Sequence, residues 1–197
     1  MKIKNLEELR DACKNSKKIL VTGPCRSGTT ICCHILIDLL GYEFIESFPN
    51  YKDSEKDVKY MGSFEHLIGY YNSLDSFIAH GPHLHPFLRA VPEDILVVFM
   101  RRNMEDVLAS TKKIKTKENG EWTDEFYSNH MRKIVKKKDQ HIFDKMSYPG
   151  KTYYVWDNYQ KQNINYVEVD YDLLASHHLF IPRGKRKNFR ERQWNLK

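Results

Sequence analysis

A loop with hydroxyl groups and one guanidinium lies between an apolar run and an apolar helix near the start of the chain. The loop reads Gly-Pro-Cys-Arg-Ser-Gly-Thr-Thr at 23–30, which is the GxxxxGK[ST] spacing of a phosphate-binding loop with threonine in the place of lysine. Backbone N–H groups of such a turn, and of the helix that follows it, form a concave anion site. Hydroxyl donors and a planar cation add to that site. We therefore expect an anion to be bound by Arg26, Ser27, Gly28, Thr29 and Thr30.

The chemistry of this loop differs from that of an ATP hydrolase, which uses the missing lysine and holds magnesium with an acidic residue at a strand end. The later apolar run ILVVFM ends in Arg101 and Arg102 instead of an acid. Asp170 is the one acidic residue that resembles such a magnesium ligand, and Glu168 interrupts the apolar run before it. The sequence therefore favours anion binding without a metal. A P-loop kinase with Arg26 in the place of lysine stays as an alternative.

A second basic motif, Arg-Asn-Met-Glu-Asp-Val-Leu-Ala-Ser at 102–110, leaves a predicted strand and enters a predicted helix. Arg102 stands at the strand end, and Ser110 follows about two helical turns later. Asp106 falls in the first turn of that helix, where an acidic side chain suits the helix dipole, so we expect it to be structural. Ligands of parallel α/β sheets bind beyond the carboxyl ends of the strands, which is where both motifs fall.

Taken together, the two motifs resemble those of the sulfotransferases that use 3′-phosphoadenosine 5′-phosphosulfate. In that family the 5′-phosphosulfate loop reads [KR]-S-G-T-T, as at 26–30 here. The 3′-phosphate motif of the family reads R-N-P-x-D-x-x-x-S, as at 102–110 here with Met104 in the place of proline. The resemblance runs from 17 to 175 and includes a strand that leads into Tyr-Asp-Leu-Leu at 171–174.

This resemblance implies a reaction as well as a P-loop-type fold. The reaction moves a sulfuryl group from the phosphosulfate donor to a hydroxyl or amine of a small-molecule, carbohydrate or peptide acceptor, leaves adenosine 3′,5′-bisphosphate, and needs no metal. Arg26 and its loop are then expected to hold the 5′-phosphosulfate, and Arg102 and Ser110 the 3′-phosphate. Arg183 and Lys185, in the basic C-terminal segment, loosely resemble the family's Arg-Lys-Gly clamp on the same 3′-phosphate.

Transfer to a hydroxyl also needs a base for the acceptor proton, and the sequence offers two kinds. His80, His83 and His85 follow a predicted strand, and histidine titrates near neutral pH. The Pro-His-Leu triplet around His83 best resembles the family's strand-end histidine, which favours His83. An ungapped count back from Pro92 favours His85 instead. Glu46 ends another predicted strand and resembles the glutamate base of the tyrosylprotein and carbohydrate branches. The H-x2-H-x-H spacing matches no common zinc site, so no metal is expected there.

Alternating strands and helices must position these motifs. Apolar runs predict strands at 17–24, 42–47, 76–81, 94–102 and 165–171. Helical spacing predicts helices at 5–16, 28–40, 64–74, 103–114, 122–138 and 151–163. The alternation favours a single α/β domain over 1–197, with a mainly parallel sheet of about five strands and helices on both faces, in three α/β/α layers.

Composition and charge limit the class of protein further. The chain has 197 residues, 41% hydrophobic and 29% charged, as in globular domains. No apolar stretch approaches the ~18 residues of a membrane span. The net charge of +6 lies entirely in the last fifteen residues, which makes a non-catalytic nucleic-acid-binding module a further alternative, although one that leaves the paired phosphate motifs unexplained. The polar N-terminus and four cysteines without a CxxC pair lead us to expect a cytoplasmic protein with no membrane anchor.

Overall fold

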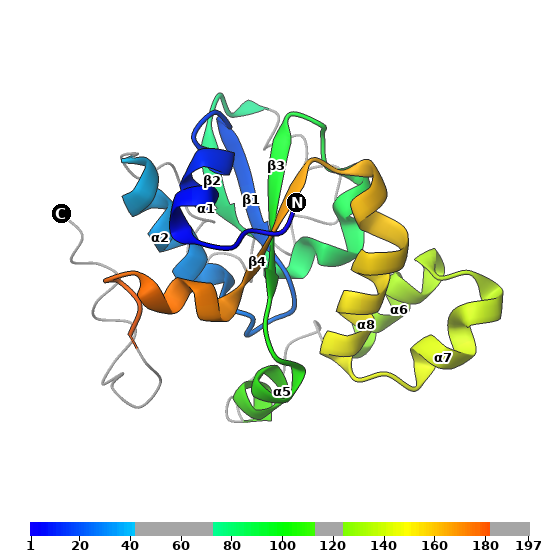
Figure 1. The fold of residues 1–197 in the computed structure, drawn as a ribbon. Coiled ribbons are helices and arrows are strands. Elements are labelled where there is room, and N and C mark those ends of the chain that lie inside the picture. The colour runs from blue at the N-terminus through cyan, green and yellow to red at the C-terminus, as the bar shows by residue number, and fades with distance from the viewer. Residues whose placement is uncertain (42–72, 113–123, 182–197) are drawn as a thin grey trace.

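The computed structural model describes residues 1–41, 73–112 and 124–181 (Figure 1). Its strands are β1 (Lys18–Thr22), β2 (Phe77–His80), β3 (Ile95–Arg101) and β4 (Tyr166–Asp170). Its α-helices are α1 (Leu6–Cys13), α2 (Thr29–Leu40), α5 (Met104–Lys112), α6 (Asp124–Ile134), α7 (Gln140–Asp144) and α8 (Tyr148–Val155). The shorter helical segments are η1 (Pro82–Ala90), η2 (Lys137–Asp139), η3 (Trp156–Gln160), η4 (Lys161–Asn163) and η5 (Tyr171–Ser176), of which η3 is a π-helix and the others are 3₁₀.

The described strands form one parallel sheet in the order β2-β1-β3-β4 (Figure 1). β1 is central and short, and its neighbours are β2 and β3, so the loop that follows β1 lies between the carboxyl ends of those two strands. The prediction of an α/β fold with a parallel sheet and flanking helices is confirmed. Of the predicted elements, the strand at 42–47 and all but the end of the helix at 64–74 lie outside the described residues.

The N-terminal segment runs alongside β4 and extends the sheet at that edge. The Ile3 N–H group donates to the Glu168 carbonyl at 2.9 Å, and the Glu168 N–H group donates to the Met1 carbonyl at 2.8 Å. The Lys2 side chain then forms an ion pair with Asp170 at 2.8 Å, at the carboxyl end of the strand. The sequence analysis described these first residues only as a polar N-terminus and did not place them beside a strand.

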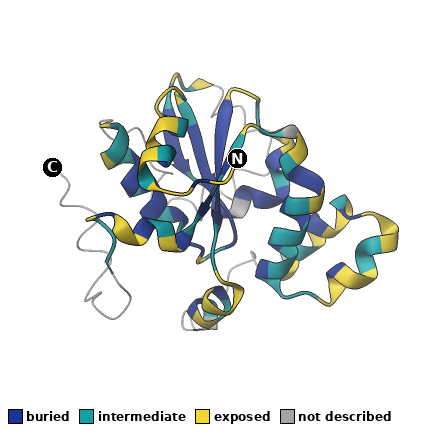
Figure 2. Cartoon of the chain, in the orientation of Figure 1, coloured by how far each residue is buried: buried dark blue, intermediate teal, exposed yellow. Residues whose placement is uncertain are grey.

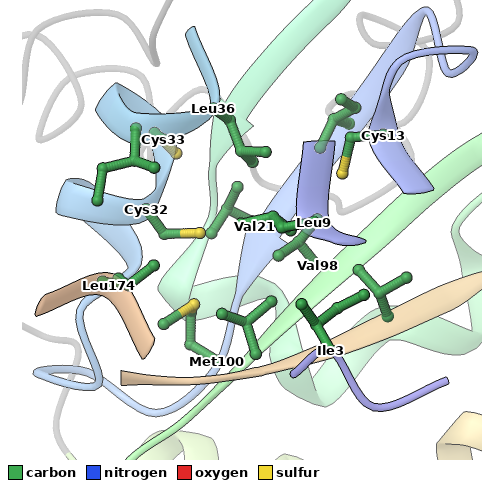
Figure 3. Close-up of a cluster of buried hydrophobic side chains, with 14 of the residues drawn as sticks. Ile3, Leu9, Cys13, Val21, Cys32, Cys33, Leu36, Val98, Met100 and Leu174 are labelled. Atoms are coloured by element: carbon green, nitrogen blue, oxygen red, sulfur yellow. The ribbon is translucent and has the colours of Figure 1, made fainter. Parts of the chain in front are cut away.

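One face of the sheet is covered by α1, α2 and η5 (Figure 1). The strands are buried between layers that are exposed only on their outer sides (Figure 2). Val21, Val98 and Met100 meet Cys32 and Leu36 of α2 in this core (Figure 3). α2 is apolar on nearly every side because it packs both against the sheet and against α1 and η5.

The buried cysteines belong to this same core and form no disulfide. Cys13, Cys32 and Cys33 are free and buried, and Cys25 in the loop is half-buried. Burial raises the pKa of Cys13 to about 12 and raises that of Cys32 and Cys33 as well. These three thiols are therefore protonated packing groups, not nucleophiles.

The opposite face of the sheet packs against η1 and against the helical stretch of α8 and η3. Leu20, Ala79 and Phe99 point to this side, and the indole ring of Trp156 stacks on the Phe99 ring with centroids 4.1 Å apart. α6 and α7 form a further small core around Tyr127 outside this layer. No helix among the described residues is long and apolar enough to cross a membrane.

Candidate anion site at the carboxyl ends of the strands

The loop after β1 has the backbone of a tight anion-binding turn. Its glycines lie at positive φ, 140° at Gly23 and 99° at Gly28, and Arg26 lies at 74°. A Cβ atom on Gly28 would stand 2.4 Å from Cδ2 of Tyr171, so the Tyr171 ring covers the turn closely. The Ser27 N–H group donates to the Pro24 carbonyl at 3.0 Å and closes the turn. Only glycine fits at Gly28, for reasons of both space and backbone angle.

The hydroxyl groups of the loop are not committed to capping the helix. Gly28 is the N-cap of α2 and makes no side-chain capping hydrogen bond. Ser27 is fully buried, and its Oγ has no hydrogen-bond partner among the described residues. A buried hydroxyl without a partner is costly, and a bound anion is a group that would satisfy it. The loop therefore has the donors that its sequence predicted.

The side chains of Thr29 and Thr30 both contact His80, the last residue of β2. Nε2 of His80 is 2.8 Å from Oγ1 of Thr29 and 3.1 Å from Oγ1 of Thr30. His80 reaches the loop because β2 pairs with β1 in parallel, with Val21 opposite His80. Of His80 and His85, the two histidines of this group whose side chains the structure describes, His80 is the one that contacts the loop.

The other two histidines stand differently. His85 lies within η1 and is almost fully buried; its Nδ1 lies 2.6 Å from the Pro82 carbonyl and its Nε2 lies 3.3 Å from Oγ1 of Thr152. A carbonyl oxygen only accepts, so Nδ1 of His85 carries a proton and donates to Pro82. His83 lies in η1, and its side chain is outside what the structure describes, so its role stays a prediction. His80 and His85 have different partners, which gives no support to a metal held by both.

The two basic motifs meet through their arginines. Nε of Arg26 donates to Oγ of Ser110 at 3.3 Å, across 84 residues of sequence. Nη1 of Arg102 donates to the Arg26 carbonyl at 3.0 Å. The Arg102 guanidinium also stacks on the Tyr171 ring, 4.0 Å from its centroid, and its Nε is buried with no hydrogen-bond partner among the described residues. The two motifs thus lie together at the carboxyl ends of β1 and β3.

Main-chain groups around Arg102 are held by a neighbouring tyrosine. The Tyr153 hydroxyl accepts from the Arg102 N–H group at 2.9 Å and donates to the Arg102 carbonyl at 3.0 Å. Oδ1 of Asn103 accepts from the N–H groups of Glu105 and Asp106 and so caps α5. Asp106 itself is exposed in the first turn of α5. Hydrogen bonds therefore hold the turn between β3 and α5 on both sides, at the backbone of Arg102 and at the first N–H groups of α5.

Arg101 faces the other way and belongs to a structural ion-pair network. It bonds to Asp157 and, at 3.0 Å, to Glu168, which also accepts from the Trp156 indole N–H group at 2.6 Å. Burial raises the pKa of Glu168, but the bonds from Arg101 and Trp156 outweigh burial and leave the pKa below its usual value. This network explains why a charged residue interrupts the apolar run of β4.

A cleft of about 810 Å³ opens beside Arg102. Its walls include Lys2 and Lys4 of the N-terminal segment, and its lining includes Tyr153 and Tyr171. Asp170 and Asp172 also line this cleft and no residue of the loop 23–30 does, so the cleft lies beside the anion loop and does not contain it. Sequence reasoning did not place the N-terminal segment beside Arg102, because this proximity depends on how the chain packs.

The remaining sequence predictions for the site fall on residues outside the described ranges. These residues are Glu46, Arg183 and Lys185. Brought together by the structure are Arg26, Ser27, Gly28, Thr29, Thr30, Arg102 and Ser110. No family model, curated protein or solved structure matches this chain, so the function of the site is argued from its own residues.

Proposed function

We propose that this chain is a sulfotransferase that moves a sulfuryl group from 3′-phosphoadenosine 5′-phosphosulfate to a hydroxyl or amine acceptor. The observation that carries the proposal is the contact between the two phosphate motifs. Arg26 bonds to Ser110, and Arg102 bonds back to the Arg26 carbonyl. A donor with phosphate groups at both its 3′ and 5′ positions needs two anion sites this close together, whereas a nucleoside triphosphate needs only the loop.

The residues present fit such a donor. Ser27 Oγ and Arg102 Nε are buried donors without partners among the described residues, and the first turn of α2 has no side-chain cap. In the proposed site, the loop amides, Ser27 and Arg26 bind the 5′-phosphosulfate, and Arg102 and Ser110 bind the 3′-phosphate. The donor supplies a sulfuryl group activated by its bond to phosphate. Arg26 stabilises the charge that develops when that bond breaks.

His80 is the residue we propose as the base for the acceptor proton. Its Nε2 lies within hydrogen-bond distance of both loop threonines, which puts an imidazole at the edge of the anion site. An imidazole titrates near neutral pH and so suits proton transfer there. His83 and Glu46, the choices made from the sequence, remain competing candidates.

The kinase alternative is less well supported by the sheet order. Of the two strands beside β1, β2 ends in His80, and β3 ends in Arg101, which Arg102 follows. None of these residues is an acidic magnesium ligand. Asp170 ends β4, one strand further from the loop, and is paired with Lys2. A Walker-type acid is thus absent from the neighbours of β1 within the described sheet.

Nucleotide selectivity tests the proposal. Adenosine 3′,5′-bisphosphate and 5′-AMP are titrated into the full chain by calorimetry, and the bisphosphate is expected to bind much more tightly. Arg102→Ala should remove a charge-assisted contact to the 3′-phosphate and lower bisphosphate affinity by about 10- to 150-fold, with little change for 5′-AMP. Arg132→Ala, which removes an exposed arginine paired with Asp144 on α6 and α7, is the matched control.

Turnover then separates anchoring from proton transfer. His80→Gln keeps a hydrogen-bonding group beside the threonines, so nucleotide affinity should hold while sulfuryl transfer falls by about 10²–10⁴-fold. His83→Ala and Glu46→Gln are assayed in parallel, and loss of turnover in one of these alone would move the base there. Equal affinity for the two nucleotides, or tighter magnesium-dependent binding of ATP than of the bisphosphate, would refute the sulfotransferase proposal.

A further inference from the structure

Three side chains with metal-binding atoms gather at the far end of α2, roughly 13 Å along the helix from the anion loop. Asp38 lies in the last part of α2, and His177 and His178 directly follow η5. The Nε2 atoms of His177 and His178 are 3.2 Å and 3.8 Å from the same Oδ2 atom of Asp38. All three ligand atoms lie within 4.8 Å of one another.

The spacing and the donor types suit a transition-metal ion. Zinc binds imidazole nitrogen and carboxylate oxygen at about 2.0–2.2 Å, so neighbouring ligands of a tetrahedral ion stand about 3.3 Å apart. The two separations from Oδ2 of Asp38, 3.2 Å and 3.8 Å, lie within about 0.5 Å of that spacing, and the two Nε2 atoms stand within 4.8 Å of each other. The two imidazole rings stack with centroids 4.4 Å apart, and both Nε2 atoms approach the same Asp38 oxygen.

We propose that Asp38, His177 and His178 bind a divalent transition-metal ion, zinc above all. Imidazole with carboxylate favours zinc, copper and nickel over magnesium or calcium, which prefer oxygen ligands alone. His177 is buried and is therefore held ready for the ion, whereas Asp38 and His178 are exposed enough for an ion to enter from solvent.

One hydrogen bond opposes the ion and limits its affinity. The Leu179 N–H group donates to Nδ1 of His177 at 3.2 Å, which leaves the ring proton on Nε2, facing Asp38. An ion on Nε2 moves that proton to Nδ1 and breaks the bond from Leu179. We therefore expect micromolar rather than picomolar binding, with a local change in the turn around Leu179.

The bound ion would join two segments that also build the anion site. α2 begins at the loop, and η5 begins with Tyr171, whose ring covers Gly28. η5 and α2 pack side by side in the core (Figures 1 and 3), where Leu174 lies near Cys32. A metal link at the other ends of both segments is expected to raise the melting temperature, and this expectation does not depend on the proposed sulfotransferase activity.

The test uses the full chain without a histidine tag. Zinc binding is measured by equilibrium dialysis and by melting temperature, and cobalt replaces zinc to give a visible absorption spectrum that reports coordination. Asp38→Asn and His178→Ala alter exposed side chains, so both variants should fold. His141→Ala removes an exposed histidine on α7, outside the cluster, and serves as the matched control.

We expect one equivalent of zinc, a higher melting temperature and a cobalt spectrum of nitrogen and oxygen ligation. Asp38→Asn and His178→Ala should each lower zinc affinity by roughly tenfold or more, and His141→Ala should leave it unchanged. The proposal is overturned if zinc does not bind at stoichiometric concentration. It is equally overturned if both cluster variants bind zinc as tightly as the native chain, because the ion is then held elsewhere.

Discussion

The Tyr153 hydroxyl is the group whose removal most directly tests how Arg102 is positioned. It accepts from the Arg102 N–H group at 2.9 Å and donates to the Arg102 carbonyl at 3.0 Å, so Tyr153→Phe leaves both groups without that partner. A buried polar group left without a partner costs about 1–3 kcal/mol. Because Arg102 is half-buried, water can serve part of this need, and we expect the free energy of unfolding to fall by about 1–2.5 kcal/mol in total.

The same substitution should weaken nucleotide binding selectively. A looser Arg102 backbone should lower affinity for adenosine 3′,5′-bisphosphate by about three- to tenfold, or roughly 0.6–1.4 kcal/mol, and leave 5′-AMP affinity unchanged. Urea unfolding and calorimetric titration measure the two effects. Tyr166→Phe is the control, because Tyr166 is also half-buried against Trp156 but its hydroxyl bonds to no described residue. If the two variants behave alike in both assays, the Tyr153 hydroxyl does not position Arg102.

Two further substitutions test the loop and the ion-pair network. Gly28→Ala places a methyl group 2.4 Å from the Tyr171 ring at a φ of 99°, so urea unfolding should show that the free energy of unfolding falls by about 2–4 kcal/mol. Gly41→Ala is the control, because Gly41 has a φ of 64° and open space around it, and its free energy of unfolding should fall by only about 1 kcal/mol. Equal losses would mean that Tyr171 does not press on the loop. Because the pKa of Glu168 is lowered from 4.5 in the folded state, its contribution to stability is present above pH 4.5 and is lost as pH falls toward the folded pKa. Glu168→Gln should therefore lower the free energy of unfolding by about 1.5–3 kcal/mol at pH 7, because the charged bond to Arg101 is lost. The loss should become progressively smaller below pH 4.5. A loss that stays constant with pH would contradict this.

The parts of the fold that could be predicted are those where a local pattern and the final packing agree. The apolar runs of β1 and β3 are buried between layers, and α2 is apolar all round because it contacts the core on several sides. The helix predicted at 151–163 was less accurate, since it starts earlier, at Tyr148, and contains a π-helical turn. There the Tyr159 carbonyl accepts two bonds from Arg89, and Gln160 donates to the His85 carbonyl. These are contacts between distant segments, and helical periodicity contains no information about them.

The candidate site also has parts that the sequence predicts and parts that it does not. The phosphate loop was readable because its glycine and hydroxyl positions are local, and the approach of Arg102 followed from the rule that parallel strands end at one edge. The choice among the histidines was not readable, because His80, His83 and His85 have the same chemistry within six residues. It is the register between β1 and β2, with Val21 opposite His80, that brings His80 to the loop.

The missing lysine of the loop illustrates how the site depends on tertiary structure. Threonine stands at its position, yet cationic groups are still present, since Arg26 lies within the loop and Arg102 arrives from the neighbouring strand. Arg102 bonds to the Arg26 carbonyl and stacks on Tyr171, so its position depends on the loop, on β3 and on η5 together. A lysine within the loop would need only the loop itself. The candidate anion site of this chain is therefore complete only when three separate segments are packed, and we expect changes in any of them to alter the affinity for the proposed nucleotide.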